Sequence, residues 1–451
     1  MSKLSFRGTD SSLEATGHRP GDIGNAAPVM RRPRPRTVIV GGGISGLAAG
    51  CFLDRTGTEI LVLEASSRTG GVIESRTIDG HLVELGPQRT RLSKPLQQLV
   101  EWLGISDRLV TAPELPLYIY SRGRLRQAPL DLRTALSTDL ISWADRLRVL
   151  MEPFTAGLDP DESAADYFIR KFGRGTYRRA IAPLFGDLYG SDPAEMPARH
   201  ALATMLRALR IDGSLLRVLI QGLRSERRPP ACSFSGGLQT LTDAMAARLG
   251  ERVRAHAAVR AIFRDGPYFR VVTDEDEVLA DRVVLSCPAA PAARATVSLD
   301  ADLSNRLADL RYNTFAVVHL ESNATFKGTG YQFALETGYA TRGVTANGAL
   351  FDRPGLFTAF LGGATHQGVT QLSEEHLGAI AASEFRAVTG FDARPLAVHQ
   401  TYMPAWDGSW NRLDDLRLPD GVHLCANWIG RPGITGRINE AAALTRELTM
   451  S

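Results

Sequence analysis

The sequence predicts an α/β fold whose first unit is a short strand, a glycine-rich turn and a helix. Residues Thr37–Val40 form a β-branched run of the kind found in buried parallel strands. The next turn carries Gly41, Gly43 and Gly46, and the apolar stretch after it is typical of a helix packed on a sheet. This order predicts a Rossmann-like unit, in which the turn holds a dinucleotide diphosphate at a helix N-terminus.

A second predicted strand, Glu59–Leu63, ends at Glu64, where a carboxylate can accept a hydrogen bond from a ribose hydroxyl. Arg68, Gly70 and Gly71 follow, and the run EASSRTGGVIESR resembles the GG-doublet flavoproteins, which include amine oxidases, phytoene desaturases and protoporphyrinogen oxidases. A nicotinamide enzyme has no use for this second glycine pair, so FAD is favoured over NAD. The motif and the resemblance assign these residues to FAD binding: Gly41, Gly42, Gly43, Ile44, Ser45, Gly46, Glu64, Ala65, Arg68, Gly70, Gly71 and Val72.

Composition narrows the class of protein. The chain has 451 residues, 44% of them hydrophobic and 22% charged, which is ordinary for a water-soluble protein of two or three domains. A net charge of +3 is too small to argue for nucleic-acid binding. The four cysteines lie far apart and neither they nor the nine histidines show metal-ligand spacing, so we expect no metal and a reducing, cytoplasmic location. Residues 1–34 are polar and lack the apolar core of a secretory signal, which predicts a disordered tail.

The remaining pattern predicts elements in order. Leu96–Leu103 is expected to be a helix, and Leu117–Leu130 a hairpin that turns at Arg122-Gly123. Residues 134–225 have helical spacing, with Asp161 as one expected N-cap. Strands are then expected over Val253–Asp265, Tyr268–Ala280 and Asp281–Ala289, and again between Tyr312 and Gln400 around a helix at Ser373–Val388. The last stretch repeats the order of strand, glycine-rich turn and helix.

These elements predict a discontinuous FAD-binding domain, a mixed-sheet substrate domain and an inserted helical domain. The FAD-binding domain is expected to combine residues 36–95, 230–300 and 415–448. The substrate-binding domain is expected to combine residues 96–133 and 301–414. Residues 134–229 are expected to form the helical domain.

Five segments resemble protoporphyrinogen and coproporphyrinogen oxidases in family order. They are LVELGPQR (Leu82–Arg89), LYIYSRGRLRQAP (Leu117–Pro129), IAPLFGDLYGSDPAEM (Ile181–Met196), CSFSGGLQTL (Cys232–Leu241) and MPAW (Met403–Trp406). The resemblance implies an FAD-dependent oxidase of haem biosynthesis, which converts protoporphyrinogen IX or coproporphyrinogen III into the porphyrin with O2 as electron acceptor. Because the flavin performs that chemistry, no catalytic side chain is named.

The resemblance also implies further site residues. Gly86, Pro87, Gln88 and Arg89 match the turn beside the flavin, and the backbone of Val259 matches the residue that holds the adenine. The loop beneath the isoalloxazine ring is matched by Asn427, Pro432, Gly433 and Ile434. This loop departs from the family at Cys425-Ala426, Gly436 and Ala441, where the family has Ala-Gly, Asp and Gly. The alternative is therefore a paralogous FAD-dependent enzyme that acts on another polycyclic metabolite.

A porphyrinogen is a large apolar macrocycle with carboxylates, so its pocket needs an arginine at the rim. Arg89 and Arg91 are the candidates for substrate binding, with solvated surface arginines as the alternative interpretation. Met205–Leu223 carries a basic amphipathic face, which fits either an anionic membrane or a helix that covers the pocket.

Other flavoprotein classes fit less well. An amine oxidase usually has a lysine on the strand matching Phe315–Glu321 and a pair of aromatic residues in the terminal loop, whereas this chain has no such lysine and only Trp428. A carotenoid desaturase would carry a longer apolar helical region. A non-catalytic FAD-binding scaffold remains a third alternative, and it would hold a flavin that no substrate reduces.

Overall fold

A five-stranded parallel sheet carries the glycine-rich turn. The computed structural model describes residues 37–155, 157–159, 161–202, 214, 229–430 and 432–450. The strand order is β10 (Val253–Arg254), β2 (Ile60–Leu63), β1 (Thr37–Val40), β14 (Arg282–Leu285) and β20 (Val422–Leu424), and neighbouring strands are parallel throughout. Three separated stretches of the chain therefore meet in one sheet, with β1 at its centre.

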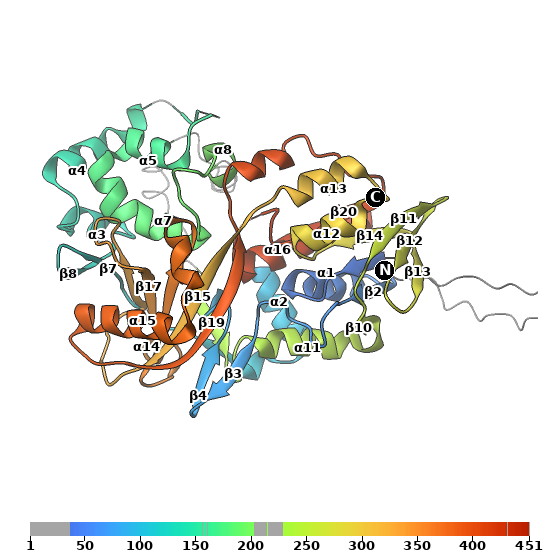
Figure 1. Ribbon diagram of the computed structural model, residues 1–451, viewed down its shortest axis with the longest axis horizontal. Coiled ribbons are helices and arrows are strands. Elements are labelled where there is room, and N and C mark those ends of the chain that lie inside the picture. Colours follow the sequence, from blue (N-terminus) through green and yellow to red (C-terminus); the bar gives the residue numbers. More distant parts are fainter. Residues whose placement is uncertain are drawn as a thin grey trace, which may run out of the picture. The chain divides into compact units, whose positions relative to one another are not determined.

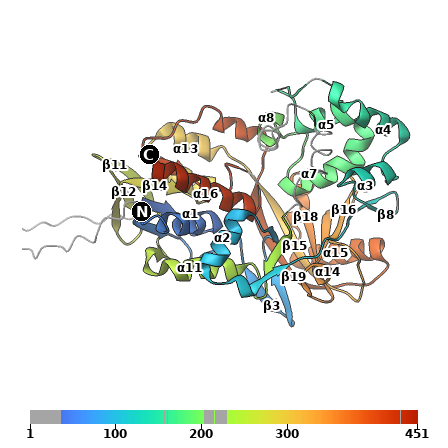
Figure 2. The same ribbon diagram turned by 180° about the vertical axis from the view of Figure 1, so that it is seen from behind.

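Helix α1 (Ile44–Asp54) is buried on this sheet and follows directly from the turn. It contacts α16 (Ile434–Met450) and α11 (Gln239–Leu249), while α2 (Lys94–Leu103) contacts both of those helices; Figure 2 shows the group on one face of the sheet. A Cβ atom placed on Gly46 would lie 1.9 Å from the carbonyl oxygen of Gly41. The third glycine of the motif is therefore needed for close packing between the helix and the turn.

A seven-stranded sheet forms the second layer (Figure 1). Its strands are ordered β19 (Arg394–Pro404), β15 (Tyr312–Glu321), β18 (Leu356–Gly362), β17 (Thr341–Ala346), β16 (Gly330–Phe333), β7 (Leu117–Ser121) and β8 (Arg124–Gln127). Only the β16–β7 pair among them is parallel. Helix α15 (Glu374–Thr389) packs its apolar side chains on this sheet, and Phe385 lies edge-on against Phe357. The predicted helix and the predicted hairpin turn at Arg122-Gly123 are confirmed.

Three smaller sheets connect these layers. They pair β3 (Ser75–Ile78) with β4 (His81–Glu84), β9 (Ala231–Phe234) with both β5 (Thr90–Arg91) and β6 (Leu109–Thr111), and β12 (Tyr268–Val272) with both β11 (Ala261–Asp265) and β13 (Glu277–Ala280). The expected single strands over Val253–Asp265 and Tyr268–Ala280 are both wrong, the latter because β12 and β13 form an antiparallel pair. The backbone of His256 has a φ of 56°, so the chain breaks there and β10 and β11 belong to different sheets.

Between β8 and β9 the described chain is helical, as predicted. It forms α3 (Leu132–Ser137), α4 (Trp143–Leu150), α5 (Ala164–Phe172), α6 (Arg174–Thr176), α7 (Ala182–Tyr189) and α8 (Ala198–Ala201). Two further helices, α12 (Ala289–Thr296) and α13 (Ala301–Ala308), follow later in the chain, after β14. The N-cap of α5 is Ser163, whose hydroxyl accepts a 3.0 Å bond from the Asp166 N–H, so the expectation for Asp161 is wrong.

The chain after Arg34 belongs to one compact unit. The predicted tail over residues 1–34 and the basic face over Met205–Leu223 lie outside the described residues, and the three-domain division stays a prediction. Among the helices that the structure describes, we find none with the length and apolar character needed to cross a membrane.

Candidate functional site

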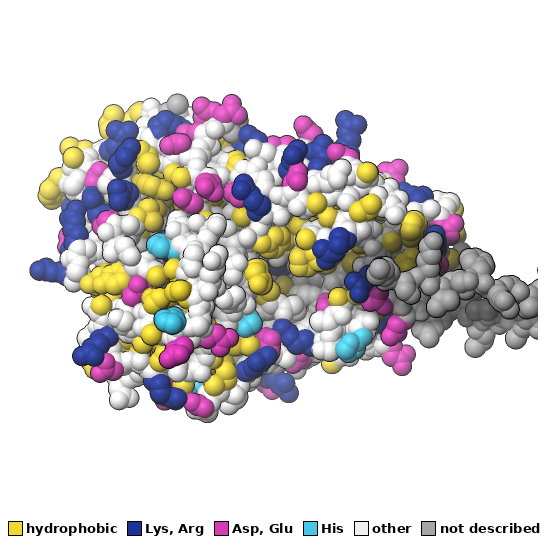
Figure 3. All heavy atoms as spheres, viewed as in Figure 1, with side chains coloured by type: hydrophobic (Ala, Val, Ile, Leu, Met, Phe, Trp, Pro, Cys, Tyr) yellow, Lys and Arg dark blue, Asp and Glu magenta, His cyan; other side chains and the backbone are white. Residues whose placement is uncertain are grey.

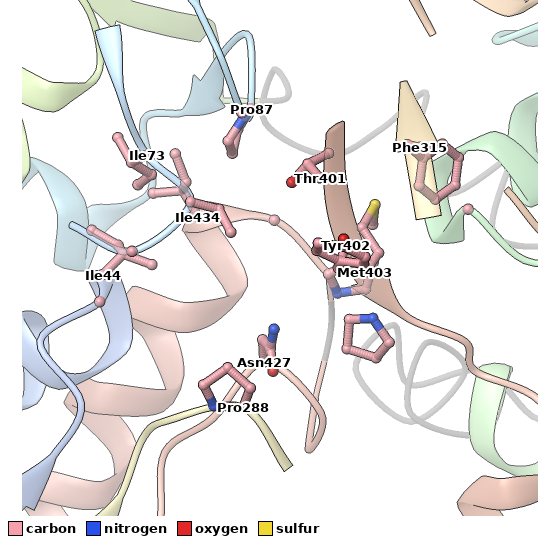
Figure 4. A pocket seen from close by; sticks show the side chains of 18 of the residues that line it. Ile44, Ile73, Pro87, Pro288, Phe315, Thr401, Tyr402, Met403, Asn427 and Ile434 are labelled. Atoms are coloured by element: carbon pink, nitrogen blue, oxygen red, sulfur yellow. The ribbon is translucent and has the colours of Figure 1, made fainter. Parts of the chain in front are cut away.

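A cavity of about 860 Å³ begins where β1, β2 and β14 end and continues to the inner face of the seven-stranded sheet. Figure 4 shows Ile44, Ile73 and Ile434 on its first side, with Thr401, Tyr402 and Met403 along β19 farther in. The carboxyl ends of parallel strands are the usual place for a nucleotide in such a sheet. Its volume and mostly apolar walls also suit a large organic ligand.

The first turn of α1 presents open backbone to this cavity. Gly43 is the N-cap of the helix, and no side chain caps the first turn. A Cβ atom on Gly43 would find only the Cα of Gly71 within 4 Å, at 3.9 Å, so there is room beside the helix N-terminus. Because unpaired N–H groups and the helix dipole favour an anion here, this cradle fits the diphosphate of FAD.

Glu64 and the glycine doublet lie against the same turn. One carboxylate oxygen of Glu64 accepts a 2.7 Å bond from the Gly42 N–H, and the other accepts bonds from the N–H and hydroxyl of Ser66. The Gly70 N–H donates to the Gly42 carbonyl across 2.8 Å, and Gly71 has a φ of 60°. Glu64, Ala65, Gly70, Gly71 and Val72 all line the cavity, as do Gly41, Gly43, Ile44 and Ser45.

Gly42, Gly46 and Arg68 have supporting positions instead, because none of them lines the cavity. The guanidinium of Arg68 donates to the carbonyls of Gly71 and Ile73 and lies 3.0 Å from the carboxylate of Glu74. Arg68 therefore fixes the path of the glycine doublet. Any contribution of this side chain to FAD binding acts through the doublet's backbone.

The turn after β4 closes one side of the cavity with Gly86, Pro87, Gln88 and Arg89. A Cβ atom on Gly86 would lie 2.0 Å from the Val72 carbonyl oxygen, so only glycine fits. The amide of Gln88 is fully used: its Nε2 donates to the carbonyls of Glu84 and Gly86, and its Oε1 accepts from Thr358 on β18. Gln88 thus ties the turn to the second sheet.

Arg89 differs from its neighbours in this turn. Its Nη1 atom is buried and has no hydrogen-bond partner in the described part of the chain. Burial, reinforced by the nearby charge of Arg91, lowers the pKa of Arg89 to about 10, so the guanidinium still carries its charge at neutral pH. A buried cation that lines a cavity without a partner favours binding of an anionic ligand group.

The side chain of Arg91, unlike that of Arg89, lies outside the cavity. Its side chain is exposed, donates a 2.9 Å bond to the carbonyl of Pro229 and does not line the cavity. The two candidate arginines are therefore not brought together, because Arg91 lies in β5, which pairs with β9 on the outside of the turn.

The terminal loop brings Asn427, Pro432, Gly433 and Ile434 to the cavity. The side-chain carbonyl of Asn427 accepts a 3.2 Å bond from the hydroxyl of Tyr312, which itself accepts from the Ala289 N–H across 3.0 Å. Arg437, in the first turns of α16, also lines the cavity, and its guanidinium contacts the Ala426 carbonyl and lies 3.0 Å from Glu440. Burial raises the pKa of Glu440 to about 7.

The far side of the nucleotide cradle contains residues that the sequence reasoning missed. Val259, which is expected to contact the adenine, lines the cavity, and so do Ser286, Cys287 and Pro288 at the end of β14. Burial raises the pKa of the Cys287 thiol to about 12, so it stays uncharged. A signal for these residues existed, because the strand expected over Asp281–Ala289 falls in the predicted FAD-binding domain, where the ends of parallel strands face the nucleotide.

The sequence also did not predict which residues line the inner chamber, the part of the cavity beside the seven-stranded sheet. Phe315, Tyr331, Phe360, Met403 and Trp406 line it. They come from four separate segments that the seven-stranded sheet and its connections bring together, so no local motif marks them. These aromatic and apolar side chains suit the binding of an apolar ring system.

Comparison with known proteins agrees with this geometry. Residues 44–432 match the family described as flavin-containing amine oxidoreductases. The chain is 27% identical over 387 residues to protoporphyrinogen oxidase 1 of Arabidopsis thaliana chloroplasts, covering 75% of this chain and 72% of that protein. It is 29% identical over 321 residues to coproporphyrinogen III oxidase of Propionibacterium freudenreichii, covering 60% of each chain.

A solved structure described as a candidate protoporphyrinogen oxidase from Exiguobacterium sp. 255-15 shares the fold, with a TM-score of 0.76 at 22% identity. The superposition covers 92% of this chain and 98% of the other. The predictions of an α/β FAD-binding fold, of FAD as cofactor and of this group of flavoproteins are confirmed. The chain belongs to the flavin-containing amine oxidoreductase family and is an FAD-dependent oxidoreductase.

Proposed function

We propose that this enzyme oxidises a porphyrinogen, protoporphyrinogen IX or coproporphyrinogen III, to the porphyrin. The guanidinium of Arg89 carries the proposal, because it lines the cavity in the turn after β4 and its buried Nη1 atom has no hydrogen-bond partner among the residues that the structure describes. A porphyrinogen offers the complementary pattern of an apolar macrocycle with propionates. The names of the Arabidopsis and Propionibacterium relatives support the same substrate class.

Each part of the chain has a defined task in this proposal. FAD, when bound, would accept the six electrons of this oxidation in three two-electron steps, with O2 as the final electron acceptor. Arg89 and the apolar walls bind and orient the macrocycle, while the backbone of Gly43, Gly71 and the terminal loop holds the cofactor. The buried position of the Arg89 Nη1 atom would strengthen its pairing with a carboxylate, because charges attract more strongly away from water. Val259 remains the proposed adenine contact.

The deciding experiment is anaerobic reduction of the bound flavin. We expect both porphyrinogens, or one of them, to bleach the visible absorbance of the bound flavin in the absence of O2. Air should restore the colour and produce peroxide and fluorescent porphyrin. If neither substrate bleaches a flavin that dithionite reduces fully, the enzyme acts on another metabolite, as the departures at Gly436 and Ala441 would allow.

We also propose that the cytoplasmic enzyme contacts an anionic membrane surface through α4. This helix and the turn after it expose Trp143, Leu147, Leu150, Met151 and Phe154, with Trp143 78% and Phe154 81% exposed. Trp143, Leu147 and Leu150 are spaced by four and three residues and share one face of α4, while Met151 and Phe154 follow in the turn after the helix. Figure 3 shows hydrophobic side chains beside lysine or arginine side chains at the end of the molecule where Figure 1 places α4.

The charges of α4 support an anionic surface. Its acidic residue Asp145 is bound by Arg179 at 3.1 Å, and Glu152 just beyond the helix is buried against Lys171 at 3.0 Å. Arg148 is exposed, and the guanidinium of Arg146 lies over the Trp143 ring. The exposed face therefore combines apolar side chains with positive charge, which is the composition of a peripheral membrane helix.

Flotation with lipid vesicles tests this contact. We expect binding to vesicles containing phosphatidylglycerol and not to pure phosphatidylcholine, with loss of binding in Leu147→Ser/Phe154→Ser. Val297→Ser/Phe391→Ser, which changes two exposed apolar residues elsewhere, is the matched control. Equal flotation of all three proteins would overturn the proposed contact, and concentration-dependent dimerisation lost in the first variant would assign the face to a second copy of the chain.

A further inference from the structure

The ring of Phe315 occupies a cage at the deep end of the chamber. Phe315 lies on β15, opposite Gly362 of β18 and Thr401 of β19, and all three residues line the cavity. Val317, two positions along the same strand, lines it as well, so this face of β15 is the chamber wall. Figure 4 shows Phe315 on the far side from Ile44, Ile73 and Ile434, the residues beside the nucleotide cradle.

Two glycines from different segments enclose this ring. A Cβ atom on Gly190, the C-cap of α7, would lie 2.4 Å from Cζ of Phe315. A Cβ atom on Gly363, directly after β18, would lie 2.7 Å from the same carbon. Real Cβ atoms do not approach a carbon so closely, so neither position accepts a side chain unless the ring moves.

This requirement is separate from backbone conformation. Gly190 has a φ of 63° and ends its helix in the left-handed region, as Gly104 does at the end of α2 with a φ of 71°. A Cβ atom on Gly104 would find nothing within 4 Å. An alanine therefore costs a similar amount of backbone strain at both positions, and only at Gly190 does it also press on Phe315.

The cage is fixed by hydrogen bonds. The side-chain amide of Asn313 donates a 3.0 Å bond to the Gly190 carbonyl, and the Gly363 N–H donates to the Thr314 carbonyl across 2.9 Å. Ser191 also contacts the Ala405 carbonyl. Both glycines are thus held to the sheet beside Phe315, so a side chain at either position would press on the ring.

We propose that Phe315 is a specificity-determining residue that limits the size and polarity of the substrate substituents reaching this end of the chamber. The inference rests on the proposed porphyrinogen oxidation and goes beyond it, because it assigns a residue that decides which porphyrinogen the enzyme prefers. Two substituents are propionates in coproporphyrinogen III and smaller, apolar vinyl groups in protoporphyrinogen IX. A rigid aromatic wall therefore favours protoporphyrinogen IX.

The test is the ratio of kcat/KM for coproporphyrinogen III to kcat/KM for protoporphyrinogen IX, which does not depend on the fraction of active enzyme. We expect Phe315→Ala to raise this ratio about tenfold, in line with the usual effect of removing a pocket wall. Gly190→Ala should lower the ratio, while Gly104→Ala should leave it unchanged. The double variant Gly190→Ala/Phe315→Ala should behave as Phe315→Ala does, because the added methyl group then meets no ring.

The outcomes separate the two proposals. If wild-type enzyme oxidises neither substrate, the proposed function fails and this inference fails with it. If wild-type enzyme oxidises them but the ratio in Phe315→Ala stays within about twofold of wild type, only the role of Phe315 is overturned. Phe315→Leu, which keeps more of the packed volume, provides the same comparison if the alanine variant loses its FAD.

Discussion

The hydroxyl of Tyr312 donates to the side-chain carbonyl of Asn427 across 3.2 Å and joins the seven-stranded sheet to the loop proposed to lie beneath the flavin. Burial raises the pKa of Tyr312 to about 12, so the hydroxyl keeps its proton over the physiological range. Because the carbonyl of Asn427 is occupied, its amide N–H groups are the ones available to a ligand in the cavity. Tyr312 is therefore a positioning residue for the proposed flavin contact.

We expect Tyr312→Phe to weaken FAD binding about three- to tenfold, the usual effect of one lost hydrogen bond, and to shift the flavin absorption spectrum. The spectral shift separates a change at the flavin from a general loss of stability. Tyr402→Phe removes a hydroxyl from another cavity residue and serves as the control. An unaltered spectrum and FAD affinity in Tyr312→Phe would show that Asn427 is oriented in another way.

Purified wild-type protein should be yellow, with one non-covalent FAD per chain. Gly43→Val should be colourless, because the new side chain would fill the space beside Gly71 that the diphosphate needs. Gly368→Val places the same side chain at an exposed glycine with no atom within 4 Å and should stay yellow. Retained FAD in Gly43→Val, measured after denaturation, would contradict the proposed cradle.

Arg89→Ala should raise KM for a porphyrinogen about tenfold and leave FAD content unchanged, because a partly buried charged pair contributes about 1.5–3 kcal/mol. Arg91→Ala is the matched control, since its guanidinium binds the Pro229 carbonyl outside the cavity. Arg89→Lys should restore only part of the affinity, because a lysine cannot make the bidentate contact. Equal KM values in Arg89→Ala and wild type would place the carboxylate elsewhere.

His319 should make the protein less stable in mild acid. The ring is buried with Nδ1 3.1 Å from the Thr358 hydroxyl, and burial lowers its pKa from 6.5 to about 4. Between these two values the unfolded chain binds a proton that the folded protein does not, so stability falls as pH drops from about 6.5 towards 4. At pH 5 the loss from this group is about 2 kcal/mol.

The measurement is the free energy of unfolding at pH 7 and pH 5 in wild type and His319→Gln. The variant should lose less stability between the two pH values, although it is less stable than wild type at pH 7. An identical pH dependence in both proteins would mean that another group controls the acid sensitivity.

The sequence by itself determined the elements whose cause is local. The β-branched run, the three glycines of the first turn and the Arg122-Gly123 turn each depend on the conformations of neighbouring residues, so β1, α1 and the β7–β8 hairpin lie where they were predicted. Most of the predicted nucleotide cradle shares this origin, since a glycine motif fixes the backbone path of its own turn.

Only the tertiary structure decided the chamber. Arg89 and Arg91 are equivalent in the sequence, yet Arg91 is turned outward because β5 pairs with β9, which comes much later in the chain. The cage around Phe315 requires Gly190 and Gly363, and these contact the ring only after a helix end and a strand end pack on β15. Such contacts depend on packing between distant segments, because the volume that each side chain occupies is set by its neighbours in space and not in sequence.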